Sequence, residues 1–464
     1  MNFLNKIEKF SSNICLINNN KERMSYEQIL KKGEKISKGL ENKSLVLILA
    51  KNHVDFFISY INFYKKGLVQ MLLDPNISSN ALNEIIKTYN PNYILLHNSR
   101  VKDFSFDVLH ELSEHKILKI NINKQYSINK DLSLLLSTSG STGSKKFVKI
   151  SYENIYENTK SIIKFLNINQ NHKTITTMPP FYTYGLSIIN THLYEGASIV
   201  VTDLRAIEKN FWKLMLDEKV LSFGGVPFFF EILKKIKFDQ MYLPSLKYFT
   251  QAGGALKKDL IKYFLNYSEK NKKKFIIMYG QTEATARMSY LPFAMAKKKI
   301  CSIGVPIPGG KIDLKKNNKF NNRDGEIVYR GKNVSMGYAN NVADLESGDK
   351  NKGILYTGDL AKRDKDGYFY ITGRKSRNIK LFGHRVNLDE LEKMLIKANF
   401  KCICHGVENK VTIFFSDKTY NNNVVNLLSK KTKIHKKCFK MKFINKFPLN
   451  ENGKISYKKL EKFL

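Results

Sequence analysis

Apolar runs long enough for one strand alternate along the chain with longer amphipathic stretches. Residues 45–50 are wholly apolar, and residues 81–89 place apolar side chains on one stripe of a helix, which Pro91 ends before another apolar run at 93–96. Repeated units of this kind are typical of parallel sheets covered by helices. The pattern therefore predicts an α/β fold in which mainly parallel sheets pack against helices.

Two further apolar runs end in loops of small and polar residues. Residues 132–136 predict a strand that leads through a Gly/Ser/Thr loop to a helix beginning near Ser151, and residues 275–278 predict a strand that ends in Tyr279 and Gly280. In open parallel sheets, ligands bind beyond the carboxyl ends of the strands. We therefore expect both loops to belong to a binding site.

Beyond Gly373 the chain changes to short charged helices and strands joined by Lys-rich and Asn-rich connections. This change predicts two domains, a large one over residues 1–374 and a smaller α+β one over residues 375–464. We find no repeat with a period of 20 to 50 residues, which argues against solenoid and propeller folds.

The composition narrows the class of protein. No apolar run approaches the roughly 18 residues that a membrane span requires, and the amino terminus lacks the apolar core of a secretory signal. We therefore expect a cytoplasmic protein with no membrane span. Five scattered cysteines indicate neither a disulfide framework nor a zinc site, and Cys402 and Cys404 fit the alternation of a buried strand.

The formal net charge is +37, from 78 Lys and Arg against 41 Asp and Glu. The excess is mostly lysine spread along the whole chain, whereas a nucleic-acid surface is expected to cluster arginine with exposed aromatic residues. We therefore expect no nucleic-acid partner. A broadly basic surface would favour anionic ligands such as ATP, or an acidic carrier protein.

The loop after residues 132–136 has the chemistry of a phosphate-binding loop. Its glycines allow a tight turn, its amides and hydroxyls can donate to phosphate oxygens, and its lysines add positive charge. A loop of this composition is more often a flexible surface turn, but its position after a buried strand favours phosphate binding. The candidate residues are Thr138, Ser139, Gly140, Ser141, Thr142, Gly143 and Lys146.

The loop after residues 275–278 offers complementary groups. Tyr279 presents a flat face for a purine, Thr282 a hydroxyl for phosphate, and Glu283 a hard oxygen ligand for Mg²⁺. Each residue alone has a structural explanation. Together at one strand end, with Gly280 and Gln281 between them, they describe half of a nucleotide site.

Two segments nearer the carboxyl end are weaker candidates. Asp359 follows a Thr-Gly turn, and Arg374 lies across an expected hairpin from it, so that the pair could hold ribose hydroxyls. A surface ion pair explains the same two residues equally well. Residues 448–454 form a turn that ends in Lys454, which by itself means little in so basic a chain.

In this order and spacing, the four segments resemble those of the adenylate-forming (AMP-binding) superfamily of acyl-CoA synthetases, luciferases and nonribosomal peptide synthetase adenylation domains. The likeness covers nearly the whole chain, from residues 25–27 to Lys454. It implies a large nucleotide- and acid-binding domain with a small mobile domain. It also implies activation of a carboxylic acid by ATP and Mg²⁺ through an acyl-adenylate, and acyl transfer to the thiol of coenzyme A or of carrier-protein phosphopantetheine, with release of pyrophosphate and AMP.

The resemblance implies roles for single residues. The loop from Thr138 to Lys146 would bind the ATP phosphates, although Lys145 stands where the family usually has proline. Lys454 would be the catalytic lysine of the mobile domain, bridging the substrate carboxylate and the α-phosphate, and Ser376 stands at the hinge, where Asp or Lys is usual. The other implied nucleotide contacts are Gly253, Gly254, Ala255 and Tyr279 around adenine, Gln281 and Thr282 in the pocket, Glu283 on magnesium, and Asp359 with Arg374 on ribose.

Residues 179–186 resemble the acyl-pocket segment of acyl-CoA synthetases, which often carry histidine where this chain has Tyr182. Peptide synthetase domains have an aspartate here that holds the substrate ammonium, and this segment has none. A small plain or hydroxylated carboxylic acid is therefore favoured over an α-amino acid. The implied substrate contacts are Phe181, Tyr182, Gly185 and Gly253.

Other functions stay open. The enzyme could stop at the acyl-adenylate and pass the acyl group to an amine or to a separate acyltransferase. A nucleic-acid-binding protein is supported by net charge alone, and a noncatalytic binding module would not need both Glu283 and Lys454.

Overall fold

The computed structural model describes residues 3–120, 126–137, 146–316, 325–381, 384–407, 409–417, 423–432, 434–449 and 455–464. The chain folds into two compact units. The first comprises Met1–Lys311 and Arg330–Leu355, and the second comprises Ile312–Tyr329 and Tyr356–Leu464. The predicted domain boundary after residue 374 stays a prediction.

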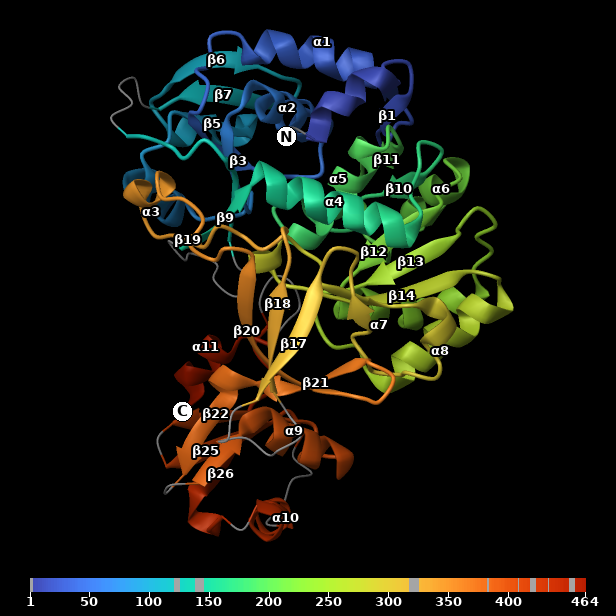
Figure 1. Ribbon diagram of the computed structural model, residues 1–464, viewed down its shortest axis with the longest axis vertical. Helices are drawn as coiled ribbons and strands as arrows, with labels where there is room; N and C mark the ends of the chain where they lie inside the picture. The colour runs from blue at the N-terminus through green and yellow to red at the C-terminus, as the bar shows by residue number, and fades with distance from the viewer. Residues whose placement is uncertain are drawn as a thin grey trace. The chain divides into compact units, whose positions relative to one another are not determined.

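The first unit contains two large sheets with parallel centres and antiparallel edges (Figure 1). In spatial order, the first sheet consists of β16 (Val305–Pro306), β15 (Ser289–Leu291), β14 (Lys274–Tyr279), β13 (Tyr248–Gln251), β12 (Ser222–Gly225), β10 (Lys173–Ile175), β11 (Ser198–Val200), β1 (Ile14–Ile17) and β2 (Arg23–Ser25). The second consists of β19 (Tyr338–Ala339), β9 (Phe147–Ser151), β8 (Leu132–Ser137), β4 (Val69–Leu73), β3 (Leu45–Leu49), β5 (Tyr93–His97), β7 (His115–Lys119) and β6 (Asp107–Glu111). The predicted α/β class is confirmed.

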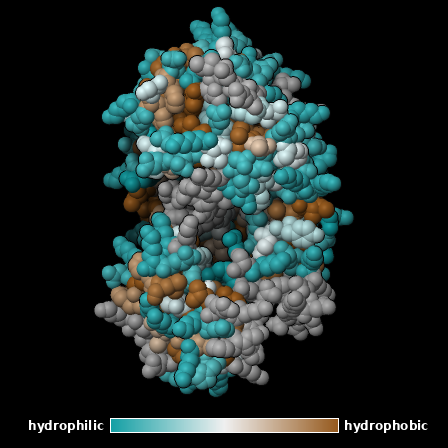
Figure 2. All heavy atoms as spheres, turned by 90° about the vertical axis from the view of Figure 1, so that its left-hand side faces the viewer, coloured by the Kyte–Doolittle hydropathy of each residue, from teal (hydrophilic) through white to brown (hydrophobic). Residues whose placement is uncertain are grey.

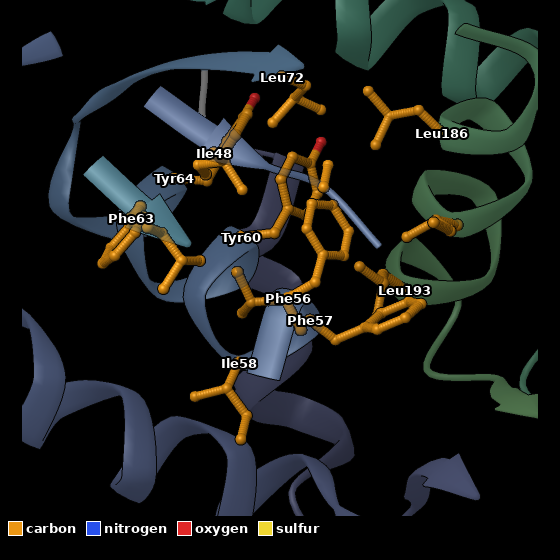
Figure 3. Close-up of a cluster of buried hydrophobic side chains, with 14 of the residues drawn as sticks. Ile48, Phe56, Phe57, Ile58, Tyr60, Phe63, Tyr64, Leu72, Leu186 and Leu193 are labelled. Atoms are coloured by element: carbon orange, nitrogen blue, oxygen red, sulfur yellow. The ribbon is translucent and has the colours of Figure 1, made fainter. Parts of the chain in front are cut away.

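The helices of this unit are α1 (Tyr26–Ser37), α2 (Val54–Lys66), α3 (Ser79–Tyr89), α4 (Tyr152–Leu166), α5 (Thr183–Tyr194), α6 (Lys209–Asp217), α7 (Pro227–Lys235) and α8 (Lys258–Lys270). Because β3 is buried on both faces, its alternate side chains belong to two cores. Val46 and Ile48 face a core shared with α2 and α5, whereas Leu45 and Leu47 face one shared with α3. Figure 3 shows Phe57 of α2 on the side that faces Leu193 of α5, and Phe63 on the side away from α5.

The elements predicted from apolar runs are present. The predicted strands at 45–50, 93–96, 132–136 and 275–278 are β3, β5, β8 and β14, and the predicted helix from Ser151 is α4, which Ser151 caps. The strand β9 was not predicted, although it lies between the Gly/Ser/Thr loop and α4. The loop therefore joins two antiparallel strands, with Ser137 paired to Phe147, and does not lead directly into the helix.

Lys149 explains why β9 was missed. This lysine is fully buried in the strand, where its Nζ donates to the carbonyl oxygens of Asp344 (3.0 Å) and Ser347 (2.7 Å). These acceptors lie almost two hundred positions away, so nothing local in the sequence shows that this charged residue can be buried.

The second unit contains three smaller sheets and short helices. Its sheets are β17 (Lys311–Lys316), β18 (Gly325–Arg330), β20 (Ile354–Arg363) and β21 (Phe369–Arg374); β22 (Asn378–Leu381) and β23 (His384–Asn387); and β24 (Cys402–Val407), β25 (Lys410–Phe415) and β26 (Phe439–Phe443). Its helices are α9 (Leu388–Lys397), α10 (Asn423–Thr432) and α11 (Tyr457–Leu460). Cys402 and Cys404 lie two positions apart on β24, so both side chains point into the same core, as predicted.

Arg377 fixes the chain just after the predicted hinge position. Its guanidinium donates to Asp389 (2.7 Å), to Glu392 and to the carbonyl oxygen of Cys404 (2.8 Å), and it lies 3.9 Å from the centre of the Tyr457 ring. These contacts join β24, α9 and α11 around one cation. Any rotation at Ser376 would therefore have to carry Arg377 together with α9, β24 and α11.

Hydrophilic side chains cover most of the face shown in Figure 2, where hydrophobic ones gather only in small groups. Over the described part of the chain, no helix combines the length and apolar character that a membrane crossing needs.

Asp55 connects the start of α2 to the hairpin of β6 and β7. Its carboxylate accepts hydrogen bonds from the Ser113 hydroxyl (2.8 Å), the Glu114 amide (2.8 Å) and the His115 ring (3.1 Å). Burial raises the pKa of Asp55, but these hydrogen bonds outweigh it and lower the pKa to about 2. A carboxyl group whose pKa falls on folding stabilises the protein above its unfolded pKa, near 4, and loses this contribution as the pH falls toward 2.

We therefore expect Asp55→Asn to lower the free energy of unfolding by about 2 kcal/mol at pH 7. Urea denaturation at pH 7 and at lower pH measures the effect, and the difference from the unsubstituted protein should shrink below pH 4. Asp107→Asn, at an exposed position on β6, is the matched control. A difference that is independent of pH would contradict the role of the charge.

Candidate functional site

Several predicted site residues follow strands that end at one edge of the first sheet. Strands β12, β13 and β14 run parallel and in register, with Gly225 paired to Gln251 and Gln251 to Ile277. Strand β10 is also parallel to β12, and the chain after it leads to α5. Carboxyl ends of parallel strands share an edge, so the segments that contain Tyr182, Gly253 and Tyr279 all begin there.

The loop after β14 reverses within very little space. A side chain at Gly280 would place its Cβ 1.7 Å from the carbonyl oxygen of Ala286. Ala286 itself has φ +115°, and Thr285 before it has φ +55°, so the backbone of this loop is held in conformations that cost energy. Asn333 stabilises the loop, because its amide donates to the carbonyl oxygens of Ala284 (2.8 Å) and Arg287 (3.2 Å).

The hydroxyl of Thr282 meets a second segment of the site. Its Oγ1 lies 2.9 Å from Oγ1 of Thr183, and both side chains are buried. Thr183 opens α5, directly after Tyr182. The loop predicted to bind nucleotide and the segment predicted to bind the acid are therefore joined by a hydrogen bond, and Thr183 is a site residue that the sequence did not single out.

Glu283 has a partner that sequence reasoning missed. One carboxylate oxygen of Glu283 accepts a hydrogen bond from the Tyr338 hydroxyl (2.8 Å), which fixes its orientation. Burial and the neighbouring Glu283 raise the pKa of Tyr338, so the phenol remains a donor at neutral pH. Lys146 Nζ lies 3.6 Å from the centre of the same ring, which brings the end of the predicted phosphate loop close to the predicted magnesium ligand.

The segment after β13 consists of residues with little or no side chain, which leaves its backbone accessible. Gly253 has φ +84°, a conformation that favours glycine, and the Gln251 side chain donates to the carbonyl oxygen of Gly254 (2.8 Å). Gly254 and Ala255 are exposed, and Tyr279 is half-buried. Exposed backbone and an aromatic ring both suit a planar base, and the role predicted for these residues around adenine stays a prediction.

The predicted acid-binding residues differ in their surroundings. The Tyr182 hydroxyl lies 2.4 Å from where a Cβ at Gly253 would stand, so these two residues pack directly together. Burial raises the pKa of Tyr182 to about 12, which keeps the phenol protonated. Phe181 packs against the core between the sheets, and a Cβ at Gly185 would lie 2.6 Å from the carbonyl oxygen of Pro179, so packing alone explains this glycine.

In the second unit, Asp359 and Arg374 form the pair that the sequence predicts. They face each other in the register of β20 and β21, and Arg374 Nε lies 2.9 Å from Asp359 Oδ1. The carboxylate is buried, whereas the guanidinium is 65% exposed. The predicted role of this pair with ribose stays a prediction.

Some predicted residues lie outside the description. The loop positions Thr138, Ser139, Gly140, Ser141, Thr142 and Gly143, and Lys454, are outside the described residues. Ser376 lies in the short helix Lys375–Arg377, but its side chain is not among those described. The roles of these residues stay predictions.

The chain is similar to enzymes of known activity. A model of the AMP-binding enzyme family matches residues 3–339. The D-alanine–D-alanyl carrier protein ligase of Staphylococcus haemolyticus (strain JCSC1435) is 24% identical over 86% of this chain and 83% of its own length. The 2-succinylbenzoate–CoA ligase of Geobacillus sp. (strain WCH70) is 25% identical over 80% of this chain and 75% of its own length.

A solved structure shares the fold over the full chain. The o-succinylbenzoate coenzyme A synthetase of Bacillus subtilis, in complex with ATP and magnesium ion, superposes with a TM-score of 0.78 at 18% identity, covering 99% of each chain. At this identity the similarity shows the fold, a large amino-terminal domain with a small carboxyl-terminal one.

Proposed function

Because the chain belongs to the family of AMP-binding enzymes, we propose that it uses ATP and Mg²⁺ to activate a small carboxylic acid as an acyl-adenylate and then transfers the acyl group to a thiol. The acceptor thiol is that of coenzyme A or of the phosphopantetheine on an acidic carrier protein. The cytoplasmic location expected from the sequence is part of this proposal.

One observation carries the proposal. The hydrogen bond between Thr282 and Thr183 joins the segment predicted to bind nucleotide to the segment predicted to bind the acid, both within the first unit. Adenylation needs these two substrates side by side, because one carboxylate oxygen must reach the α-phosphorus of ATP. A protein that only bound a nucleotide would not require this junction.

The chemistry needs no covalent nucleophile from the protein. A carboxylate oxygen attacks the α-phosphorus, the bond to the bridging oxygen breaks, and pyrophosphate leaves with the electron pair. Thiolate then attacks the acyl carbon, a thioester forms, and AMP leaves. The protein contributes by holding the reactants in line and by neutralising charge.

The described residues fit these tasks. The carboxylate of Glu283, oriented by Tyr338, is a hard oxygen ligand of the kind that Mg²⁺ prefers, and a bound magnesium ion would neutralise phosphate charge there. Thr282 would donate to phosphate, and Lys146 would add positive charge beside Glu283. Lys454 would supply a further cation in the first half-reaction and leave when the small domain rotates at Ser376.

The relatives do not identify the acid or the acceptor of this chain. The two ligases named above act on different acids, D-alanine and 2-succinylbenzoate, and use different acceptors. Residues 179–186 contain no carboxylate that could hold an ammonium group. We therefore propose an acid without an α-amino group.

ATP–pyrophosphate exchange tests the proposal. The purified full chain is supplied with ATP, Mg²⁺, labelled pyrophosphate and one acid at a time from aliphatic, hydroxy, aromatic and amino acid sets. We expect label to enter ATP with one class of non-amino acid, and only with magnesium and acid both present. Exchange with α-amino acids alone would contradict the proposed acid class, and absence of exchange with every acid would contradict adenylation.

The acceptor is tested by adding coenzyme A or a phosphopantetheinylated carrier protein after exchange is established. Thioester formation would support the thiol ligase. Release of acyl-adenylate without a thioester would instead favour the alternative in which an amine or a separate acyltransferase takes the acyl group.

A further inference from the structure

Arg287 is a buried cation whose side chain has no hydrogen-bond partner among the described residues. Its side chain lies among the largest fully buried ones of the described residues, with 1% of the residue exposed. None of its three guanidinium nitrogens donates a hydrogen bond to any residue that the structure describes. Its backbone is fixed, since the carbonyl oxygen accepts from the amides of Asn158 (2.9 Å) and Asn333 (3.2 Å).

Among the described residues, none of the titratable groups that interact with Arg287 supplies a negative charge at pH 7. The guanidinium lies 4.9 Å from the centre of the Tyr184 ring, and the other titratable groups that influence it or feel its charge are Tyr248 and His192. Burial raises the pKa of both tyrosines to about 12 and lowers that of His192 to about 3, so all three are neutral at pH 7. A buried arginine remains charged and is costly without an anion.

The position of Arg287 points to the acid site. Tyr184, whose ring it contacts, belongs to the acid segment and directly follows Thr183, the residue bonded to Thr282. The Tyr184 hydroxyl bonds Thr250 Oγ1 (2.6 Å) and lies 2.8 Å from where a Cβ at Gly224 would stand. Arg287 therefore contacts the acid segment through the Tyr184 ring, whose hydroxyl lies beside β12 and β13.

The surroundings suit a short carbon skeleton. Tyr184 packs in an apolar cluster with Ala252, Ile276 and Met278, which follow the same sheet face. A carbon skeleton bound beside Tyr184 would therefore meet apolar side chains as well as the guanidinium.

We propose that Arg287 binds a second anionic group of the acid, and that the substrate is accordingly a carboxylic acid carrying another carboxylate at its far end. This inference rests on the proposed function, because it assigns the far end of the acid that is adenylated. A planar guanidinium binds a carboxylate through two parallel hydrogen bonds, which no monocarboxylic acid of the same length can make.

The first test compares matched acids in ATP–pyrophosphate exchange. Butanoate is paired with butanedioate, pentanoate with pentanedioate, and benzoate with benzene-1,3-dicarboxylate. We expect kcat/KM to be at least about 10-fold higher for the diacid of at least one pair. Equal or lower values for the diacid in every pair would overturn the inference while leaving adenylation intact.

Two variants separate binding from packing. Arg287→Met keeps the length of the side chain without its charge, and it should lower kcat/KM for the diacid about 100-fold while changing that of the matched monoacid by less than about 3-fold. Arg287→Lys keeps the charge but lacks the planar guanidinium. Its kcat/KM for the diacid should lie between those of the unsubstituted protein and of Arg287→Met. Equal losses for both acids in both variants would show a purely structural role and overturn the inference.

Thermal unfolding gives a readout that does not depend on catalysis. The preferred diacid should raise the Tm of the unsubstituted protein in proportion to the logarithm of its concentration, and should not raise that of Arg287→Met. Without ligand, Arg287→Met should unfold at a higher temperature, because it removes an unpaired buried charge.

The two readouts distinguish the possible failures. Absence of exchange with all acids, together with a diacid effect on Tm that needs Arg287, would contradict adenylation but support the anion site. A Tm rise of equal size with chloride or sulfate would instead show a site for free inorganic anions and overturn the assignment to the acid. A diacid effect retained in Arg287→Met would also overturn it.

Discussion

Glu283→Gln is expected to lower kcat/KM for ATP–pyrophosphate exchange by roughly 10³-fold. Glutamine has nearly the same shape and can still accept the hydrogen bond from Tyr338, so the loop should remain folded. What the substitution removes is the negative charge that a magnesium ion needs. A higher Mg²⁺ concentration should therefore restore the exchange rate of Glu283→Gln only in part. A magnesium titration of the variant and of the unsubstituted protein measures this recovery.

Tyr338→Phe is the matched control for this prediction. It keeps the Glu283 charge and removes only the hydroxyl that orients the carboxylate, so we expect a loss of about 10-fold, with an increased magnesium requirement. Unfolding temperatures of both variants should stay near that of the unsubstituted protein. A Glu283→Gln enzyme with unchanged magnesium dependence would contradict the role of Glu283 as a metal ligand.

The sequence predicted those parts of the site whose pattern is local. Residues 275–278 of β14 are an unbroken apolar run that leads into Tyr279 and Gly280, and burial of such a run between helices requires no information from elsewhere. The hairpin that pairs Asp359 with Arg374 is similarly local, since a turn containing Gly367 joins the two strands. Both were correctly placed for this reason.

The parts that were missed depend on contacts between distant segments. Lys149 can be buried in β9 only because carbonyl oxygens near residue 345 accept hydrogen bonds from its Nζ. Tyr338 reaches Glu283 across 55 positions. Arg287 was not singled out because its burial without an anion is a property of the packed interior, which one apolar–polar pattern cannot show.

The distances between the candidate site residues also depend on contacts between distant segments. The structure joins Thr282 to Thr183 at one edge of the first sheet, and it joins Glu283 to Tyr338 of β19 in the second sheet, with Lys146 over the Tyr338 ring. Nothing in the sequence gives these distances. Because the hydroxyl pair and the carboxylate are set by the loop after β14, the shape of that loop controls both halves of the proposed site.

Gly280→Ala is therefore expected to abolish exchange and to lower the free energy of unfolding by about 3 kcal/mol. The added Cβ would lie 1.7 Å from the carbonyl oxygen of Ala286 and 2.8 Å from Cα of Arg287, and neither backbone atom can move as a flexible side chain would. The loop must open, which displaces Thr282 and Glu283 together. Urea denaturation measures the stability, and exchange measured well below the unfolding transition separates the lost activity from unfolding.

Gly348→Ala is the matched control, because the nearest atom to its added Cβ is the Asn129 side chain at 3.9 Å and the backbone there needs no positive φ. We expect that variant to change stability by no more than about 0.5 kcal/mol and to keep full activity. If Gly280→Ala behaved like Gly348→Ala, the loop would have to be soft enough to accept a side chain, and the tight reversal after β14 could not be what positions Thr282 and Glu283. A folded Gly280→Ala protein that has lost exchange would instead show that the glycine is required for the geometry of the site.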